Sequence, residues 1–359
     1  MVAQSINKSA KFSPAIGRPP GSNTLLWSGV GLLMLCLTFT SFRDNRSLQP
    51  FRITGLAQGT SYSITYYHQR ELVHQREIDS IFNRLDQSLS IYSPTSLISR
   101  FNQSATGIEV DIHLRKVTER SLEIFNDTDG AFDITVYPLV KKWGFGIEKV
   151  ALLPNSATIR SILPCVGSGK IRLVQSQLVK AVPCTQIDVN GIAQGYSVDV
   201  VAAYLERKGI RNYLVEVGGE LRVKGRKYPE NKVMSIGIQT PTENDFESGD
   251  IQRVIEIDQG GITTSGNYRK YRQIGSRRLS HIIDPKTGFT TQSEIISVTV
   301  LAKDALTADG YDNALLAMGL PKALSFLKRH PSLNAYIIYQ KQDGSVGDTA
   351  TAGFYKSNR

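Results

Sequence analysis

The sequence predicts a mixed α/β domain of the α+β kind, with an N-terminal membrane anchor in front of it. Alternating, strand-like runs occur near both ends of the chain, and helical stripes lie between them. Strands and helices do not follow one another in the regular order of a doubly wound sheet. No repeat of fixed period divides the 359 residues, and 41% apolar with 21% charged residues is an ordinary globular composition. We therefore expect one folded domain at 51–345.

The expected elements begin with a strand pair, because FRITGLA and TSYSITYY alternate on either side of a turn at Gln58-Gly59. A helix is expected at 71–90, where apolar residues recur every three or four positions. A polar linker precedes the domain at 43–50, and a tail follows it at 346–359. Further along, the pattern predicts helices at 113–127, 192–208, 305–318 and 321–329, a strand-rich tract at 213–300 and a last strand at 335–340.

The anchor is expected at 24–42, a run of nineteen residues without a charge. This length nearly matches the ~20 residues that cross a bilayer. Lys8, Lys11 and Arg18 precede the run, and upstream cations favour a cytoplasmic leader at 1–23. We therefore expect the domain to face the periplasm from the inner membrane.

Two alternatives to a retained anchor stay open. A cleaved signal peptide usually has an apolar region of only ~7–15 residues that ends in small residues, whereas this one ends in Thr-Ser-Phe-Arg. Lipidation of Cys36 is the other alternative, but Leu33-Met34-Leu35 lacks the small residue expected before a lipoprotein cysteine. An uncleaved anchor is the preferred interpretation.

The formal charge of +10 is spread unevenly. Five cations against one carboxylate in the first fifty residues account for four of these charges, which leaves +6 for the rest. A modestly basic body suits an anionic ligand such as a pyrophosphate. No arginine-rich run or zinc-knuckle spacing indicates nucleic acid, so we expect no nucleic-acid partner.

Two cysteines follow the anchor, Cys165 and Cys184. They flank IRLVQSQLVKAV, whose alternation is typical of a hairpin. An exported protein can join such cysteines as a disulfide, and two buried free thiols are the alternative. Geometry decides between them.

The tract GAFDITVYPLVKKWGFG at 130–146 is the most unusual passage. FDITVYP alternates like a strand, yet Asp133 is a rare residue for one. Trp143-Gly144-Phe145-Gly146 sets two aromatic rings among glycines, which let a ligand approach the backbone and supply flat faces for it. An ordinary turn with core aromatics is the alternative.

Two further passages contain glycine turns. In IDVNGIAQGYSVDVVAAYL, a strand-like approach ends at Asp188, and a turn then enters a helix whose N-terminus suits a phosphate. Asp188 is otherwise a helix cap. In VEVGGELRVKG, Gly218-Gly219 interrupts a strand, which is consistent with a bulge or a close backbone contact.

Two polar passages lie in the last third of the chain. ITTSGNYRKYRQIGSRRLSHIIDPKTG predicts two strands with their turn and offers His281 as a general base or phosphate contact. A structural histidine is the alternative. In LTADGYDNALLAMG, Asp309 and Asn313 lie four apart on one helix face and offer two oxygens to a hard cation. Asp309 is otherwise a cap.

Together these passages resemble the FAD:protein FMN transferase (ApbE) family. The resemblance runs from about Gly55 to Gly319, in order, through GTSYSI, SIYSPTSLISRFN, GAFDITVYPLVKKWGFG, IDVNGIAQGYSVD, VEVGGELRVKG, TTSGNYR, SHIIDPKTG and TAD. It implies a single catalytic domain of T-fold-like architecture, a flavin site, a magnesium-dependent reaction and an exported location.

The resemblance also assigns residues. Its magnesium ligands would be the backbone carbonyl of Gly191 and the side chains of Asp309 and Asn313. Gln58 stands where the family commonly has methionine, Gln194 where it often has lysine, and Asn313 where threonine is usual. Like that threonine, Asn313 offers a neutral oxygen four residues after Asp309 on the expected helix. The implied FAD-contacting residues are Gln58, Tyr92, Ala131, Phe132, Asp133, Asp188, Gln194, His281 and Ile283.

The implied reaction cleaves FAD at its pyrophosphate, attaches FMN to a threonine or serine hydroxyl of a partner protein and releases AMP. A magnesium ion would neutralise phosphate charge as the bond breaks. We expect His281 to act as the catalytic base, with an aspartate contact as the alternative. The implied acceptor is a subunit of a membrane redox complex. Two other functions stay open: a magnesium-dependent FAD pyrophosphatase, and a non-catalytic periplasmic flavin-binding protein.

Overall fold

The computed structural model describes residues 47–147, 150–239, 251–267, 271–274 and 277–356. The expected leader at 1–23 and anchor at 24–42 therefore lie outside the described residues. Among the helices that the structure does describe, none combines the length and the apolar character needed to cross a membrane.

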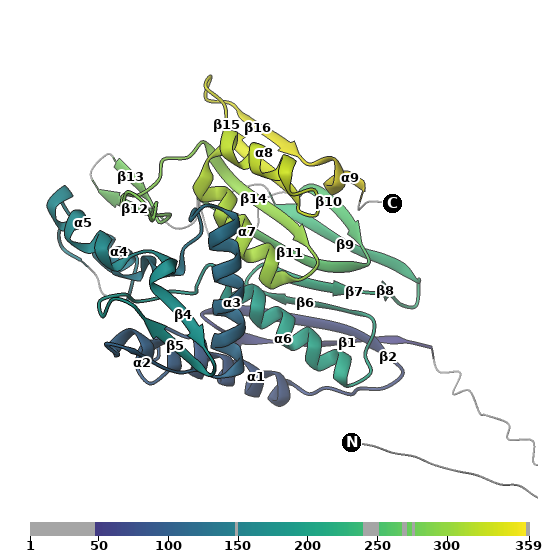
Figure 1. Ribbon diagram of the computed structural model, residues 1–359. Helices are drawn as coiled ribbons and strands as arrows, with labels where there is room; N and C mark the ends of the chain where they lie inside the picture. The colour runs from purple at the N-terminus through teal and green to yellow at the C-terminus, as the bar shows by residue number, and fades with distance from the viewer. Residues whose placement is uncertain (1–46, 148–149, 240–250, 268–270, 275–276, 357–359) are drawn as a thin grey trace, which may run out of the picture. The chain divides into compact units, whose positions relative to one another are not determined.

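An eight-stranded antiparallel sheet organises the part of the chain that the structure describes (Figure 1). Its order is β1-β2-β6-β7-β11-β14-β15-β16, so segments from the two ends of the domain form opposite edges. This sheet and its helices confirm the mixed α/β class. The strands are β1 (Gln49–Ala57), β2 (Thr60–His68), β6 (Tyr213–Val217), β7 (Glu220–Lys224), β11 (Gln259–Gly266), β14 (Ile295–Ala302), β15 (Asn334–Gln340) and β16 (Val346–Ala350).

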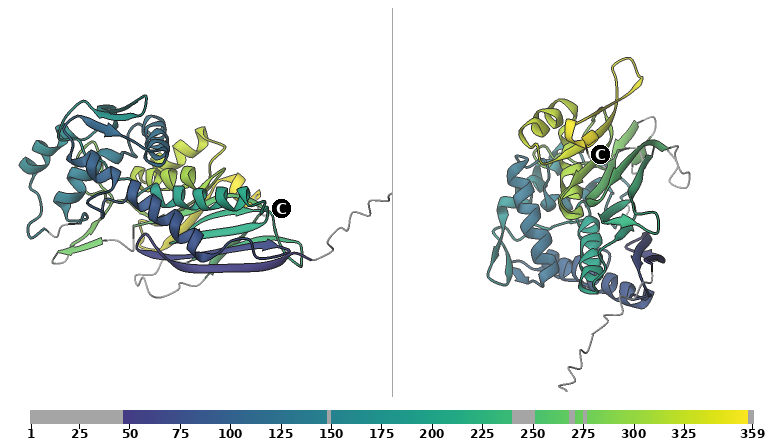
Figure 2. Two further views of the ribbon diagram at one scale, coloured as in Figure 1. Left: turned by 90° about the horizontal axis from the view of Figure 1, so that it is seen from below. Right: turned by 90° about the vertical axis from the view of Figure 1, so that its right-hand side faces the viewer.

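Helices cover one face of this sheet (Figures 1 and 2). α7 packs on β11 and β14, and α6 packs on β6 and β7. The backbones approach closely, because a Cβ built on Gly195 of α6 would lie 2.4 Å from the carbonyl oxygen of Ala305. The longer helices are α1 (Gln75–Leu89), α3 (Ile112–Asp127), α6 (Ala193–Arg207), α7 (Ala305–Met318) and α8 (Leu320–Arg329).

A small sheet covers the other face. Its strands are β8 (Arg226–Lys227), β9 (Lys232–Gln239) and β10 (Ile251–Ile257). Alternate residues of β9 are buried and share a core with Leu301 of β14. The preceding residue of β14, Val300, belongs instead to the core beneath the helices. Since successive strand residues point to opposite faces, the large sheet carries one apolar layer on each side.

A region of short elements flanks the sheet. The expected hairpin is confirmed as β4 (Ile171–Val174) and β5 (Gln177–Lys180), with β3 (Gly107–Glu109) beside it. Cys165 and Cys184 form a disulfide, which resolves the alternative of two free thiols. The remaining elements here are α2 (Leu97–Gln103), α4 (Tyr137–Trp143), α5 (Ser156–Ile162) and the hairpin of β12 (Tyr271–Ile274) with β13 (Arg277–Ser280).

Most long elements match the expectation closely. The β1–β2 turn falls at Gln58-Gly59, and α7 has the predicted bounds. α1 begins at Gln75 rather than at residue 71, because His74 and Glu77 form a capping box that fixes its start.

The prediction of a strand at FDITVYP was wrong. Residues Ile134–Val136 form a 3-10 turn that leads directly into α4. Asp133 caps this turn with its side chain, and Pro138 occupies the first turn of α4, where its missing N–H costs nothing. These helix-start signals outweigh an alternation of only a few residues.

Three smaller expectations were wrong in whole or in part. Gly218-Gly219 is the tight turn between β6 and β7, both residues having positive φ, and not a bulge within one strand. The close contact expected there is confirmed, because a Cβ built on Gly218 would lie 2.4 Å from Nε2 of Gln194. The approach to Asp188 is irregular backbone and not a strand. The run at 335–340 is not the last strand, because β16 follows and pairs with it, and α9 (Ala352–Lys356) comes after.

Candidate active site

A cavity of about 470 Å³ opens between the loop after α3, the turn before α6 and the residues after β13. Nine residues that the sequence singled out line it: Tyr92, Ala131, Phe132, Asp133, Asp188, Gly191, His281, Ile283 and Asn313. The structure therefore gathers most of the predicted site around one opening, which we call the main cavity.

One wall of the main cavity is apolar and aromatic. Phe132 and Ile283 are buried, and the ring of Phe145 meets His281 edge-on with centroids 6.4 Å apart. Gly144 ends α4 with a φ of 77° and turns the chain so that Phe145 lies against the cavity. Flat, apolar surfaces of this kind suit an aromatic ring system.

Asp133 organises the loop around the cavity. Its Oδ1 accepts hydrogen bonds from the backbone and hydroxyl of Thr135 and from the hydroxyl of Ser168, at 2.6–2.8 Å. Its Oδ2 accepts from the Ser168 N–H at 3.0 Å. A buried carboxylate with four internal donors fixes this loop, so its side chain supports the cavity wall.

The turn before α6 brings Asp188 and Gly191 into the cavity. Asp188 Oδ1 accepts from the Asn190 N–H at 2.9 Å, and α6 starts after Ile192 without a side-chain cap. The alternative in which Asp188 caps the helix is therefore wrong. The N–H of Gly195 donates to Asp309 Oδ2 at 2.9 Å, so the first turn of α6 is directed at a carboxylate.

The three predicted metal ligands meet at one point. The Nδ2 of Asn313 lies 3.2 Å from the carbonyl oxygen of Gly191 and 3.3 Å from Oδ1 of Asp309. Asp309 is within α7 and not at its start, where Asp304 is the cap, so the capping alternative for Asp309 is wrong. The nitrogen and oxygen of the Asn313 amide are assigned from the hydrogen-bond network. Rotation of the amide group by 180° would bring its oxygen, instead of its nitrogen, toward Gly191 and Asp309. The set is then a carbonyl, a carboxylate and an amide oxygen, which fits a hard cation.

Two carboxylates that the sequence reasoning missed complete this cluster. Asp312 is fully buried, and its Oδ1 accepts from Ser265 at 2.9 Å, while no described residue donates to its Oδ2. Burial, with the charge of Asp309, raises the pKa of Asp312 well above its usual range. Burial and the charges of both aspartates also raise the pKa of Glu220. An uncompensated group of carboxylates favours a bound cation.

The sequence held a signal for both residues. Asp312 lies three positions after Asp309 on the same helix, and Glu220 follows the Gly-Gly turn directly. Only the sheet order, which sets β7 beside β11 beneath α7, brings them together.

A second cavity of about 530 Å³ contains the remaining two predicted cofactor residues, Gln58 and Gln194. It shares Tyr92 and Asn190 with the main cavity. The Nε2 of Gln58 donates to the hydroxyl of Ser197 at 2.8 Å, which holds this side chain against α6. The two cavities are therefore neighbouring compartments with a common wall.

His281 follows β13 at the rim of the main cavity. The next segment folds as the expected turn, in which Asp284 Oδ1 accepts from the Lys286 N–H at 2.8 Å. The indole of Trp143 donates to the carbonyl of Gly288 at 2.8 Å and thereby fixes the turn to α4. These contacts hold the backbone that carries His281.

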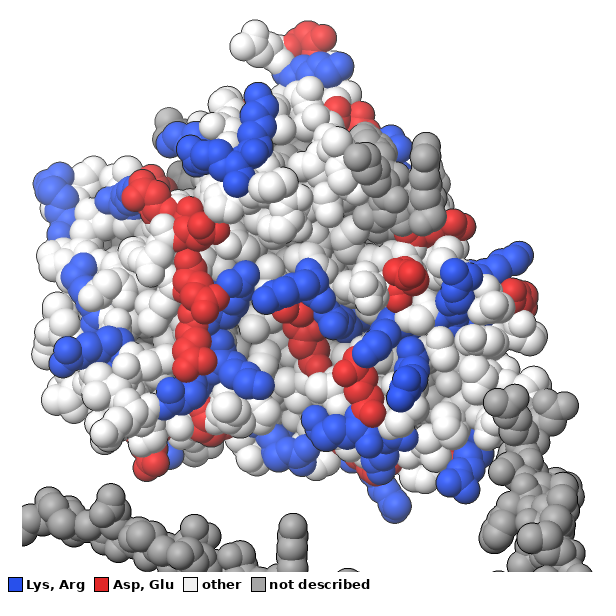
Figure 3. Space-filling model, turned by 45° about the vertical axis from the view of Figure 1, so that its right-hand side comes forward, with Lys and Arg blue, Asp and Glu red and all other residues white. Residues whose placement is uncertain are grey.

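The surface charge is mixed. Figure 3 shows both signs of charge on one face, with a run of adjoining acidic side chains on its left and basic side chains on either side of that run. The groups that would contact a ligand lie in and beside the main cavity: aromatic walls, oxygen donors and a histidine.

Comparisons with known proteins relate the chain to one family. The model of the ApbE family matches residues 58–337. The chain is 33% identical to the FAD:protein FMN transferase of Haemophilus influenzae over 336 residues, covering 90% of this chain and 96% of the relative. It is 37% identical to the FAD:protein FMN transferase of Escherichia coli strain K12, covering 72% and 74%.

Solved structures show the same fold. The flavin transferase ApbE of Vibrio cholerae has a TM-score of 0.77 at 34% identity, covering 86% of this chain and 99% of that one. The apo flavinyl transferase ApbE of Pseudomonas stutzeri has a TM-score of 0.78 at 31% identity, covering 88% and 98%. With the family model, these matches establish that the chain belongs to the ApbE family.

Proposed function

We propose that this chain is an FAD:protein FMN transferase, which cleaves FAD, attaches FMN to a threonine or serine hydroxyl of a partner protein and releases AMP. The observation that carries the proposal is the meeting of the aromatic main cavity with the oxygen cluster of Gly191, Asp309 and Asn313. Relatives that share most of the chain's length have this activity as their name.

FAD joins two aromatic halves through a pyrophosphate, and the two cavities offer a compartment for each half. The common wall at Tyr92 and Asn190 would then lie beside the pyrophosphate. Gly191 follows Asn190 directly and lines the main cavity, so its carbonyl would lie near the same pyrophosphate. Gln58 and Gln194 line only the second cavity and would contact one half of the ligand.

Magnesium is the cation we propose for the oxygen cluster, held by Gly191, Asp309 and Asn313. When bound, it supplies charge neutralisation to the phosphates. Burial and the neighbouring carboxylates raise the pKa values of Asp312 and Glu220, so binding of a divalent ion would be coupled to release of their protons. Gly195 keeps Asp309 oriented through its N–H.

His281 is the proposed base. It lies on the rim of the main cavity, with Phe145 against one side of its ring. There it can accept the proton of an incoming hydroxyl, which then attacks the FMN phosphorus as AMP departs. The bond formed is a phosphoester to the acceptor, and the bond broken is the pyrophosphate link.

We further propose that the domain works on the periplasmic face of the inner membrane, anchored by 24–42, and modifies a subunit of a membrane redox complex. The uncharged run with cations before it supports this orientation. The disulfide between Cys165 and Cys184 is consistent with an oxidising compartment.

One experiment tests the central proposal. The full chain is incubated with FAD and magnesium, with and without candidate acceptor proteins, and intact masses and AMP are measured. Transfer predicts an FMN-sized mass increase on an acceptor together with stoichiometric AMP. Rapid AMP release without an acceptor would favour the pyrophosphatase, and FAD binding without AMP release would favour a flavin carrier.

A further inference from the structure

The disulfide between Cys165 and Cys184 is close in sequence to two walls of the main cavity. Ser168, three residues after Cys165, donates to Asp133. Asp188 follows four residues after Cys184. Asp133 and Asp188 both line the main cavity. The bridge therefore joins two segments that each reach the cavity wall within a few residues.

Both segments bind the same short stretch of the wall, residues 133–135. On the side of the first cysteine, the hydroxyl of Ser168 donates to Oδ1 of Asp133 at 2.7 Å, and its N–H donates to Oδ2 at 3.0 Å. On the side of the second cysteine, the N–H of Asp188 donates to the carbonyl of Ile134 at 2.7 Å. The disulfide and these hydrogen bonds thus close a ring that includes part of the cavity wall.

The ring is buried at the wall and open to solvent at the bridge. Asp133, Thr135 and Ser168 are buried. Cys184, in contrast, is exposed, and Cys165 is half-buried. A dissolved dithiol can therefore reach the bridge, because thiol–disulfide exchange requires access to a sulfur atom.

The segment after the first cysteine has room to move. A cavity of about 500 Å³ adjoins it, and Leu163, Val166 and Gly167 line this space together with Asp133. Side chains do not fill the space beside the segment, so the segment can shift once the bridge is open.

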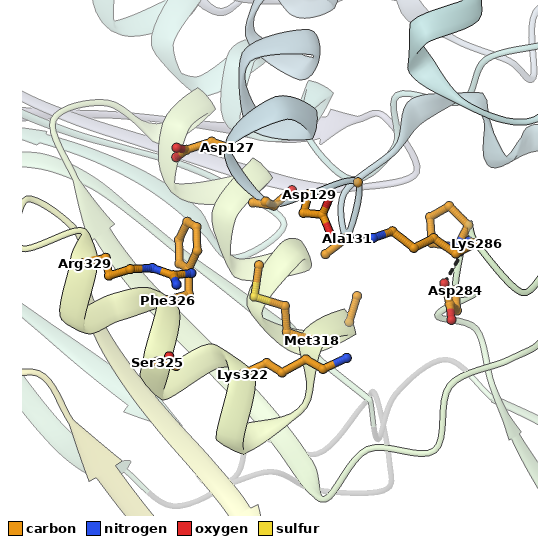
Figure 4. Close-up of a pocket in the computed structure, with 14 residues that line it drawn as sticks. Asp127, Asp129, Ala131, Asp284, Lys286, Met318, Lys322, Ser325, Phe326 and Arg329 are labelled. Atoms are coloured by element: carbon orange, nitrogen blue, oxygen red, sulfur yellow. Dashed lines mark hydrogen bonds and ion pairs between the residues drawn. The ribbon is translucent and has the colours of Figure 1, made fainter.

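An ion pair also restrains the loop that contains Asp133. Asp129 Oδ2 lies 2.6 Å from Nζ of Lys286, beside Ala131 (Figure 4). Both charged side chains are exposed. Exposed ion pairs contribute little to stability. The buried hydrogen bonds from Ser168 are therefore the stronger restraint on this loop.

We propose that the Cys165–Cys184 disulfide is a redox-sensitive device that sets the affinity of the main cavity for FAD. With the bridge closed, residues 165–168 are ordered before the ligand binds, and Asp133 is held in the wall. With the bridge open, these residues gain conformational freedom that FAD binding must remove. The inference rests on the proposed function for the identity of the ligand.

The redox step is a thiol–disulfide exchange with a dithiol. The dithiol supplies two electrons and two protons, and the bond between the two cysteine sulfurs breaks. Both cysteines become thiols, and the dithiol becomes a disulfide. Oxidation of the two thiols by a disulfide reverses the step.

The change on reduction should be local. The β4–β5 hairpin lies between the two cysteines and keeps its own backbone bonds. At its base, the N–H of Ala181 donates to the carbonyl of Lys170 at 2.8 Å. Reduction therefore frees the residues between each cysteine and the hairpin, and the hairpin itself stays paired.

The test compares FAD affinity in the two redox states of the full-length chain. FAD is titrated without magnesium, before and after reduction with dithiothreitol, while a thiol assay and circular dichroism follow the bridge and the fold. Ser168→Ala removes the hydroxyl bond to Asp133. Ser176→Ala is the matched control, because Ser176 is exposed in the turn of the hairpin between the same cysteines.

Reduction should weaken FAD binding about tenfold in the wild type and in the Ser176→Ala control. Ser168→Ala should bind FAD more weakly than the wild type when oxidised, and should lose less affinity on reduction. Because linkage is reciprocal, saturating FAD should raise the ratio of reduced to oxidised dithiothreitol needed for half-reduction by the same factor.

Two results would overturn the inference alone. One is equal FAD affinity of the oxidised and reduced wild type. The other is loss of the folded circular dichroism spectrum on reduction, since the bridge would then hold the whole domain and not the cavity wall.

Failure of the proposed function would look different. If FAD binds in a redox-dependent manner but the chain neither modifies an acceptor nor releases AMP with magnesium, the inference stands and the transferase proposal fails. If neither redox form binds FAD, both fail together.

Discussion

The N–H of Gly195 donates to Oδ2 of Asp309 at 2.9 Å and joins two helices whose sequences lie 114 positions apart. The bond leaves Oδ1 of Asp309 facing Asn313 and the carbonyl of Gly191. The first turn of α6 thus orients a carboxylate of α7 toward the oxygen cluster. Under the proposed function, the affinity of the cluster for a cation would therefore depend on how closely the two helices pack.

Asp309→Asn should reduce magnesium affinity and FMN transfer by about 100-fold, because it removes the charge yet keeps an oxygen that accepts from Gly195. Isothermal titration with magnesium and a transfer assay measure the two effects. Asp258→Asn is the control, since Asp258 is exposed and lines neither cavity. Unchanged magnesium affinity in Asp309→Asn would remove this residue from the metal site.

Asn313→Thr should keep magnesium affinity near the wild-type value, and Asn313→Val should lower it by about 10–100-fold. Threonine and valine have nearly the same shape, but only threonine retains an oxygen at the helical step shared with Asp309. Titration of both variants with magnesium makes the comparison. Equal affinities would show that the oxygen of residue 313 does not contact the ion.

Removal of the disulfide by Cys165→Ser with Cys184→Ser should lower the free energy of unfolding by about 3 kcal/mol, as expected for a bridge that closes a loop of this size. Thermal unfolding with and without dithiothreitol checks this value. Reductant should lower the Tm of the wild type toward that of the variant and leave the variant unaffected. A wild-type Tm that does not respond to reductant would contradict the prediction.

Glu77 gives a pH prediction. Hydrogen bonds from Tyr204, from the backbone of His74 and from Lys208 lower its pKa to about 2. Because the pKa is lowered in the folded state, ionised Glu77 stabilises the fold at pH values above 4.5, the usual pKa of a glutamate. This stabilisation is lost as the pH falls from 4.5 toward 2. Between pH 5 and pH 3, the wild type should therefore lose more stability than Glu77→Gln, which can keep the cap but does not titrate. Parallel Tm curves for the two proteins would contradict this expectation.

Local signals predicted the long helices well. α7 has an apolar face, a capping aspartate at 304 and a glycine at 319, so pattern and termination signals agree. At FDITVYP they disagreed, and the prediction followed the alternation although Asp133 and Pro138 marked a helix start. A run of seven residues fits both the helical and the strand periodicity, so the residues that cap a helix decide which structure forms.

The sequence could suggest members of the candidate site but not their arrangement. Their spacing on one helix made Asp309 and Asn313 candidate ligands, and the structure brings their side chains together. The sequence did not identify Glu220 and Asp312 as their neighbours, because that proximity depends on the pairing of β7 with β11. Nor did it show that Asp133 uses both oxygens within the protein, since Ser168 reaches it only through the tertiary fold.

The shared wall at Tyr92 and Asn190 has a consequence for turnover under the proposed function. An intact dinucleotide that reaches into both compartments is a bivalent ligand, and its second half binds at a high effective concentration once the first is seated. Cleavage of the pyrophosphate ends this avidity. AMP then dissociates as a monovalent fragment, so the same geometry that retains the substrate also releases the leaving group.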